Sequence, residues 1–344
     1  DPEFFKVNAE QAGIFVTSYS DERWDKLGQQ ADKLSVEDRT GLVADAKALS
    51  ASGYTSSTNF LKLISKLNNE SSFVVWEQIV NSLFSLKTTW MFEPEEVNDA
   101  LNEFTKELVA DKAHGMGWEF NSSDSFATQR LKVEMFGAAC AAKDTRTETA
   151  ALEMFEKYIA GDKKAIPALI KPIVFNAVGR NGGVENYEKI YQIYLNPTST
   201  DEKLAALRTL GRFSDPALIE RTLGYLLDGS VLTQDIYIPM QGLRTHKEGV
   251  NALWTWLQNN WDEIVDRLPA ELSMLGSVVT ITTSGFASLE AIKEIKQFFS
   301  TRSTKGFDQS LAQSLDTITS KAQWVNRDRE VVSQYLKDNG YYKN

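Results

Sequence analysis

Hydrophobic residues recur at every third or fourth position along most of the chain, which is the spacing of an amphipathic α-helix. From Ser20 onward this pattern predicts roughly seventeen helices and a helical content above about 60%. The helices pair about every 30–40 residues, without an obvious repeat in the sequence. Two clear apolar stripes are Val97, Leu101, Phe104 and Leu108, and Trp254, Leu257, Trp261 and Ile264.

Polar residues mark where these helices begin and end. Three segments have the form of an N-terminal capping box: Ser35–Asp38, Thr145–Glu148 and Ser199–Glu202. Asp215 precedes Pro216, as an N-cap residue precedes a first-turn proline. Short polar turns join the predicted helices, and no Gly/Ser-rich or Pro-rich linker divides them. We therefore expect residues 20–344 to form one right-handed α-superhelix, a HEAT- or armadillo-like solenoid of paired antiparallel helices with a concave face.

The first residues have a different pattern. Residues 5–19 contain two short extended runs, one on each side of Glu10–Gly13, and predict a β-hairpin. A two-stranded hairpin is marginal alone, so we expect this one to be the remnant of a preceding β-sheet. Residues 1–4 resemble a translated cloning scar, which suggests a recombinant fragment of a longer protein.

Composition restricts the possible functions. The chain has 344 residues and a net charge of −10, which disfavours binding to nucleic acid or to an anionic membrane surface. No apolar run approaches the ~20 residues of a membrane span, and no signal peptide opens the chain. The single cysteine, Cys140, lies in a run of small residues and is expected to be a buried packing residue. These features favour the cytoplasm.

No catalytic or metal-binding motif is present. The two histidines, His114 and His246, are far apart in the sequence, and no His-Glu-x-x-His occurs. The glycine-rich run 179–183 follows a helical pattern rather than a strand, so it predicts a helix C-terminus instead of a phosphate loop. We therefore expect no catalytic residue and no metal site in this chain.

The order of several short motifs resembles a known family. Phe5–Asn8 and Gly13–Tyr19 are similar to the end of a β-sandwich domain in gluzincin zinc aminopeptidases of the puromycin-sensitive and ER aminopeptidase-like type. Further landmarks recur in the same order as in that family, and most closely in its yeast alanine/arginine-type branch. They are Trp24, Asp38-Arg39, Leu42-Val43, Asp45, Glu70, Trp76-Glu77, Ala177–Gly179, Tyr187, Glu202-Lys203, Gln234-Asp235, Gly249 to Trp254, and Asn260-Trp261.

The resemblance implies the C-terminal helical domain of a four-domain exopeptidase that removes N-terminal residues from peptides. The parent would hold one zinc ion in an earlier domain, so this chain alone would be inactive. The helical domain would contact the catalytic and β-sandwich domains, close over the active site, limit access and bind the distal part of the peptide.

The resemblance and the chemistry of carboxylates together indicate two candidate substrate-binding residues. Arg244 lies at a helix end before His246, and its planar fork suits a peptide C-terminal carboxylate. Lys87, in the Leu86–Thr88 turn, is the second candidate. A basic residue near a helix C-terminus can also simply cap the last carbonyl groups.

Two other functions remain open. The chain could be a free-standing α-solenoid scaffold that binds a protein partner, or an unrelated helical enzyme. The β segment favours the aminopeptidase domain over the scaffold, because a free scaffold has no use for half a sheet. The enzyme alternative lacks a convergent set of acid, base and nucleophile.

Overall fold

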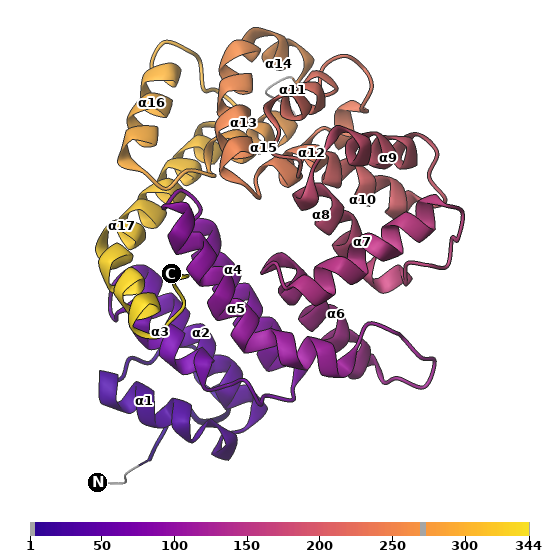
Figure 1. Cartoon of the computed structure of the whole chain (residues 1–344). Helices are drawn as coiled ribbons and strands as arrows, with labels where there is room; N and C mark the ends of the chain where they lie inside the picture. Colours follow the sequence, from indigo (N-terminus) through magenta and orange to yellow (C-terminus); the bar gives the residue numbers. More distant parts are fainter. Residues whose placement is uncertain (1–3, 269–272, 344) are drawn as a thin grey trace. The chain divides into compact units, whose positions relative to one another are not determined.

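The computed structural model describes residues 4–268 and 273–343. These residues form seventeen α-helices and four short 3-10 helices, and about 71% of them are helical. No strand occurs in the described ranges. The predicted all-α class is confirmed (Figure 1). The number of α-helices in the described residues also agrees with the prediction.

The chain divides into two compact units, one comprising residues 1–148 and 323–344 and the other residues 149–322. In unit 1, α2, α4 and α6 pack in sequence as one layer, while α3 packs on α2 and α5 on α6. Unit 1 contains α1 (Asp21–Gln29), α2 (Val36–Ser52), α3 (Ser57–Ser65), α4 (Phe73–Thr89), α5 (Glu95–Met116) and α6 (Phe126–Ala141).

Unit 2 is likewise a stack of two helical layers. Helices α8, α10, α12 and α15 follow one another in one layer. In the other layer, α9 packs on α8 and α10, α13 packs on α12 and α15, and α11 packs on α13. The bounds are α8 (Lys171–Asn181), α9 (Val184–Leu195), α10 (Thr200–Leu210), α11 (Pro216–Gly224), α12 (Tyr237–Leu243), α13 (Lys247–Asn259), α14 (Trp261–Arg267), α15 (Ser273–Thr283) and α16 (Leu289–Phe299). A unit boundary falls within α7 (Thr145–Ile159) and another within α17 (Asp308–Asp338). The single superhelix expected over residues 20–344 stays a prediction.

Helix starts follow the capping signals of the sequence. The Ser35 hydroxyl accepts a hydrogen bond from the Asp38 N–H at 3.1 Å, and Ser199 does the same for Glu202. The third predicted box is displaced by one residue. The carboxylate of Asp144, not Thr145, accepts from the Thr147 N–H at 3.0 Å. Aspartate and threonine side chains can both cap a helix N-terminus, but the carboxylate of Asp144 also interacts with the positive end of the helix dipole.

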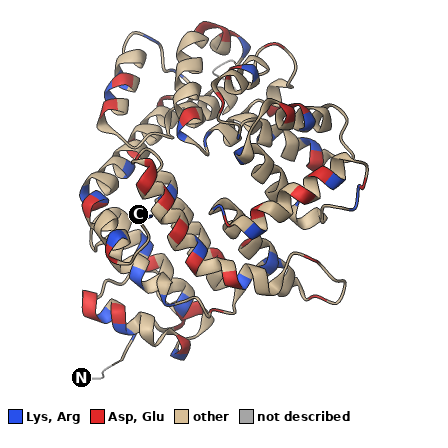
Figure 2. Ribbon diagram, in the orientation of Figure 1, with Lys and Arg blue, Asp and Glu red and all other residues tan. Residues whose placement is uncertain are grey.

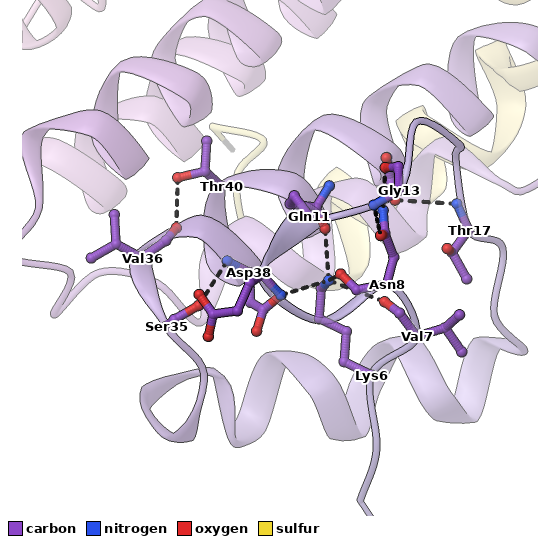
Figure 3. Close-up of polar contacts among 12 residues, drawn as sticks. Lys6, Val7, Asn8, Gln11, Gly13, Thr17, Ser35, Val36, Asp38 and Thr40 are labelled. Carbon is purple, nitrogen blue, oxygen red and sulfur yellow. Dashed lines mark hydrogen bonds and ion pairs between the residues drawn. The ribbon is translucent and has the colours of Figure 1, made fainter.

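The β-hairpin expected over residues 5–19 is wrong. This segment is irregular, with one 3-10 turn at Ala9–Gln11. Its polar groups bond to side chains instead of to a second strand (Figure 3): Asp38 accepts from Lys6 Nζ at 2.9 Å and from the Glu10 N–H at 2.8 Å, and Asn8 pairs with both backbone groups of Gly13. These bonds satisfy donors that a strand ladder would otherwise use. The expectation for residues 1–4 falls almost wholly outside the described residues.

The core confirms the packing role expected for the cysteine. Cys140 is fully buried, as are Trp76 and Trp90. Within unit 1, the Trp90 and Trp324 rings meet edge to face with centroids 5.4 Å apart. Such aromatic pairs add to the hydrophobic gain of burial.

Charged residues are distributed over the helices of both units, with acidic and basic positions interspersed (Figure 2). In the described parts of the chain, no helix has the length and hydropathy needed to cross a bilayer.

Candidate functional site

The first predicted binding residue, Arg244, lies at the C-terminal cap of α12 in unit 2. Glycines position this helix end, because α10 and α12 touch through Gly211 and Gly242. A Cβ added at Gly242 would lie 2.1 Å from the Arg208 carbonyl oxygen, and one at Gly211 would lie 2.1 Å from that of Pro239. The backbones therefore approach more closely than any larger residue permits, and this contact sets the origin of the Arg244 side chain.

The Arg244 guanidinium lies against the C-terminal end of α15. Its Nη1 donates to the Ile281 carbonyl oxygen and to the Ser284 hydroxyl, both at 3.0 Å. Gly285 leaves room for this arrangement, since a Cβ there would lie 2.8 Å from the Arg244 Nε. The Nε is buried and has no hydrogen-bond partner among the described residues. Burial lowers the pKa of Arg244, and no carboxylate of a described residue contributes to the shift.

Lys321 joins Arg244 at the same helix end. Its Nζ donates to the Ser284 carbonyl oxygen at 3.2 Å. Burial, and secondarily the positive charge of Arg244, lowers the pKa of Lys321 to about 8. Both residues are half-buried, so part of each side chain reaches the surface. Sequence reasoning missed Lys321 because it lies far from Arg244 along the chain.

The basic residues continue along the same layer of unit 2. Arg180 lies in the last turn of α8, and Arg212 follows the end of α10. Burial, with the charges of Arg180 and Arg208, lowers the pKa of Arg212 to about 10. Arg180, Arg212 and Arg244 recur at intervals of 32 residues, a regularity in the sequence that could have indicated this row. We call Arg180, Arg208, Arg212, Arg244 and Lys321 the basic row.

The second predicted residue, Lys87, lies within the last turn of α4 rather than in a turn between helices. It is half-buried and belongs to unit 1, whereas Arg244 belongs to unit 2. Each residue is therefore placed only within its own unit.

The chemistry available at the basic row is recognition of an anion. No described carboxylate forms an ion pair with Arg244 or Lys321. The C-terminal carbonyls of α15 carry only partial negative charge, so they balance two cations incompletely. Arginine has five N–H donors, of which Nη1 supplies the bonds to α15. Donors of this kind are suited to a carboxylate or a phosphate.

The two histidines have structural contacts. His246 caps α13, accepting from the Gly249 N–H at 3.1 Å through Nδ1, and its Nε2 lies 2.9 Å from the Gly211 carbonyl oxygen. His114 Nε2 lies 2.8 Å from Asp144. The described residues contain no group of three or more His, Cys, Asp or Glu that could hold a metal ion.

Comparison with known proteins gives a consistent result. The sequence model of the ERAP1-like C-terminal domain matches residues 4–320. "Aminopeptidase 2, mitochondrial" of Saccharomyces cerevisiae is 72% identical over 342 residues, which cover 99% of this chain and 36% of that protein. "Alanine/arginine aminopeptidase" of the same yeast is 61% identical over 98% of this chain and 40% of that protein. "Glutamyl aminopeptidase" of Rattus norvegicus is 25% identical over 97% of this chain and 35% of that protein. The chain thus spans little more than a third of the length of these relatives.

Proposed function

The chain belongs to the ERAP1-like C-terminal domain family, and from this premise we propose that it is the substrate-contacting domain of a zinc aminopeptidase. In this proposal the zinc ion and the catalytic residues lie in another part of the longer protein. The present domain closes over the active site, limits access to it and holds the distal part of the peptide. It also contacts the catalytic and β-sandwich domains of the same protein.

The basic row is the observation that supports a peptide-binding role. A peptide held by its N-terminus at a zinc ion presents its C-terminal carboxylate at the other end. Arg244 and Lys321 offer two partly desolvated cations without a carboxylate partner among the described residues. A carboxylate that binds there gains charge-assisted hydrogen bonds in a setting of reduced dielectric.

Steady-state kinetics of the full-length protein tests this role. We expect Arg244→Ala to raise KM about tenfold for peptides with a free C-terminus, which corresponds to about 1.4 kcal/mol. The same variant should leave a one-residue chromogenic substrate nearly unaffected, because that substrate is too short to reach the basic row. Arg244→Lys keeps the charge but loses the planar fork, and should give an intermediate KM.

Two further comparisons sharpen the test. Amidation of the peptide C-terminus should raise KM for the wild-type protein and have little effect on Arg244→Ala. Lys87→Ala tests the second candidate by the same assay. Equal effects of Arg244→Ala on long and one-residue substrates, or no effect on either, would reject the role.

A free-standing scaffold is the alternative function. The β-strand argument against it no longer applies, because residues 5–19 form no strand. The preference for the aminopeptidase domain now depends on the family match and on relatives that carry aminopeptidase names. Peptide hydrolysis by the longer protein that contains this chain decides between the two functions.

We also propose a cytoplasmic location, which the single buried cysteine and the acidic net charge favour. The name of one relative contains the word "mitochondrial", so the relevant test is cell fractionation with an antibody to this chain. Recovery with the cytosolic fraction is expected, and recovery with mitochondria would contradict the proposal.

A further inference from the structure

A groove of about 600 Å³ lies in unit 2 between α11 and α13 and ends at α14. Its floor is apolar: Ile219 and Leu223 from α11 and Trp256 from α13 are each less than 10% exposed. Polar residues form the rim, including Asn251, Thr255 and Asn259 along one side of α13. The groove belongs to the layer of α11 and α13, whereas the basic row follows α8, α10, α12 and α15.

Helical spacing explains why the groove runs along both helices. Lining residues recur three or four positions apart, from Pro216 to Leu227 on one side and from Glu248 to Asn259 on the other. Small residues on the facing sides keep it open. Apart from its chain neighbours and its own helix backbone, Gly224 has no atom of a described residue within 4 Å of the position that a Cβ would take, and Ala252 faces the same space. A side chain at position 224 would therefore extend into the groove without a clash at its Cβ.

The groove is also negatively charged. Glu220, Glu248 and Glu263 are exposed among its lining residues, and none of the described lining residues is lysine or arginine. Glu263 pairs with Arg267 at 2.9 Å, and Glu248 lies 3.4 Å from His246 Nδ1. Glu220 forms no ion pair with a described residue. An apolar floor below an acidic rim suits a ligand that has both an apolar face and positive charge.

We propose that this groove binds an amphipathic, basic helical segment of another protein. The wall formed by the thirteen residues of α13 is about 20 Å long, and a bound helix of similar length has three to four turns. Its apolar residues, spaced three and four apart, contact Ile219, Leu223 and Trp256. Its lysines and arginines pair with the glutamates of the rim, in the helix-in-groove mode of recognition. Charge complementarity favours this occupant over an anionic membrane, which the rim would repel.

The test uses the full 344-residue chain and a defined probe. The probe is a fluorescein-labelled peptide of about thirteen residues, made of leucine and lysine with the leucines at helical spacing. A scrambled peptide of the same composition serves as the matched ligand control. Fluorescence anisotropy measures Kd at two ionic strengths, since pairing with an exposed acidic rim weakens as salt screens it.

Three variants identify the site. Gly224→Phe fills the groove at a position open to a side chain, and should weaken binding at least about tenfold. Glu220→Gln combined with Glu263→Gln should weaken binding and reduce its salt dependence. Glu294→Gln removes an exposed carboxylate of α16 outside the groove, and should leave Kd unchanged. Circular dichroism checks that each variant keeps its helical content.

The amphipathic peptide should bind at least about tenfold more tightly than the scrambled peptide. Equal binding of the two peptides, or binding that survives Gly224→Phe in a folded variant, would overturn the proposal. Sedimentation of the chain alone provides a second check. A dimer that Gly224→Phe dissociates would show that the groove holds a second copy of this chain, and would also overturn it.

Discussion

The contact between α10 and α12 offers a stringent test of the local structure around Arg244. The substitution Gly242→Ala adds one methyl group, whose carbon would lie 2.1 Å from the Arg208 carbonyl oxygen and 3.0 Å from the Gly211 Cα. Close carbon–oxygen contacts in proteins are about 3.3–3.6 Å, so the two helices must separate by about 1 Å. The obstructing atoms belong to the backbone and cannot move aside by a change of rotamer.

The expected magnitude is the difference between two effects. Overpacking in a close-packed interface costs about 1–3 kcal/mol and occasionally more. Alanine within a helix is about 0.5–1 kcal/mol more favourable than glycine. The clash should prevail, so we expect a net loss of about 1–2 kcal/mol in the free energy of unfolding. For a unit of about 150–250 residues this loss lowers Tm by about 2–8 °C.

The assay is thermal unfolding followed by circular dichroism at the helical band. Gly224→Ala is the matched control, because it makes the same change in a helix of the same unit. There, no described residue outside the local helix backbone and the two chain neighbours has an atom within 4 Å of the added carbon. This control should leave Tm unchanged or raise it slightly. If Gly242→Ala melts no lower than Gly224→Ala, the close approach of α10 and α12 is wrong, and so is the position of Arg244.

Three further outcomes are expected. Arg221→Ala should lower the free energy of unfolding by about 1–2 kcal/mol, since Arg221 lies over three tyrosine rings and pairs with Glu188; the rings are those of Tyr187, Tyr191 and Tyr225. Urea titration measures this loss. An Arg221→Lys variant as stable as the wild type would contradict the role of the planar guanidinium. Ser57→Ala should lower the free energy of unfolding by about 1–3 kcal/mol in the same assay, because the Ser57 hydroxyl donates to Asp328 and accepts from the Trp324 Nε1 in the core of unit 1. A decrease of less than about 0.5 kcal/mol would contradict this hydrogen-bond network. The pKa of Lys321 falls from 10.5 to about 8 on folding, so the unfolded chain binds more protons between these pH values and the stability of the fold rises with pH there. Lys321→Met should therefore stabilise the chain at pH 7, with a gain in stability that fades towards about pH 10.5. A gain in stability that is independent of pH would refute the shift.

Local signals made much of the fold predictable from the sequence. The hydroxyls of Ser35 and Ser199 cap the helices that the capping boxes predicted, because such a cap depends on neighbouring residues alone. Residues 5–19 could not be predicted in this way. Their alternating pattern is compatible with a strand, but their polar groups find partners on α2, including Asp38 and Asp45. Which side chains of α2 are available depends on tertiary packing.

The candidate site was predictable only in part. The position of Arg244 at a helix end follows from the sequence, and the structure confirms it. Its bonds to the end of α15 and its closeness to Lys321 depend on the packing of helices that are distant in the sequence. The space that Gly285 leaves for the guanidinium could not be recognised without the structure.

The central claim is that this chain contacts substrate but supplies no catalysis, and zinc content measured together with peptide hydrolysis tests it most directly. Elemental analysis gives the zinc content, and the release of N-terminal residues from one peptide gives the rate of hydrolysis. Both quantities are measured on the purified chain and on the full-length protein. The expected result is one zinc ion and hydrolysis for the full-length protein, with neither for the chain alone, because catalytic zinc needs three protein ligands and an open position. One tightly held zinc ion per isolated chain, accompanied by hydrolysis, would contradict the account.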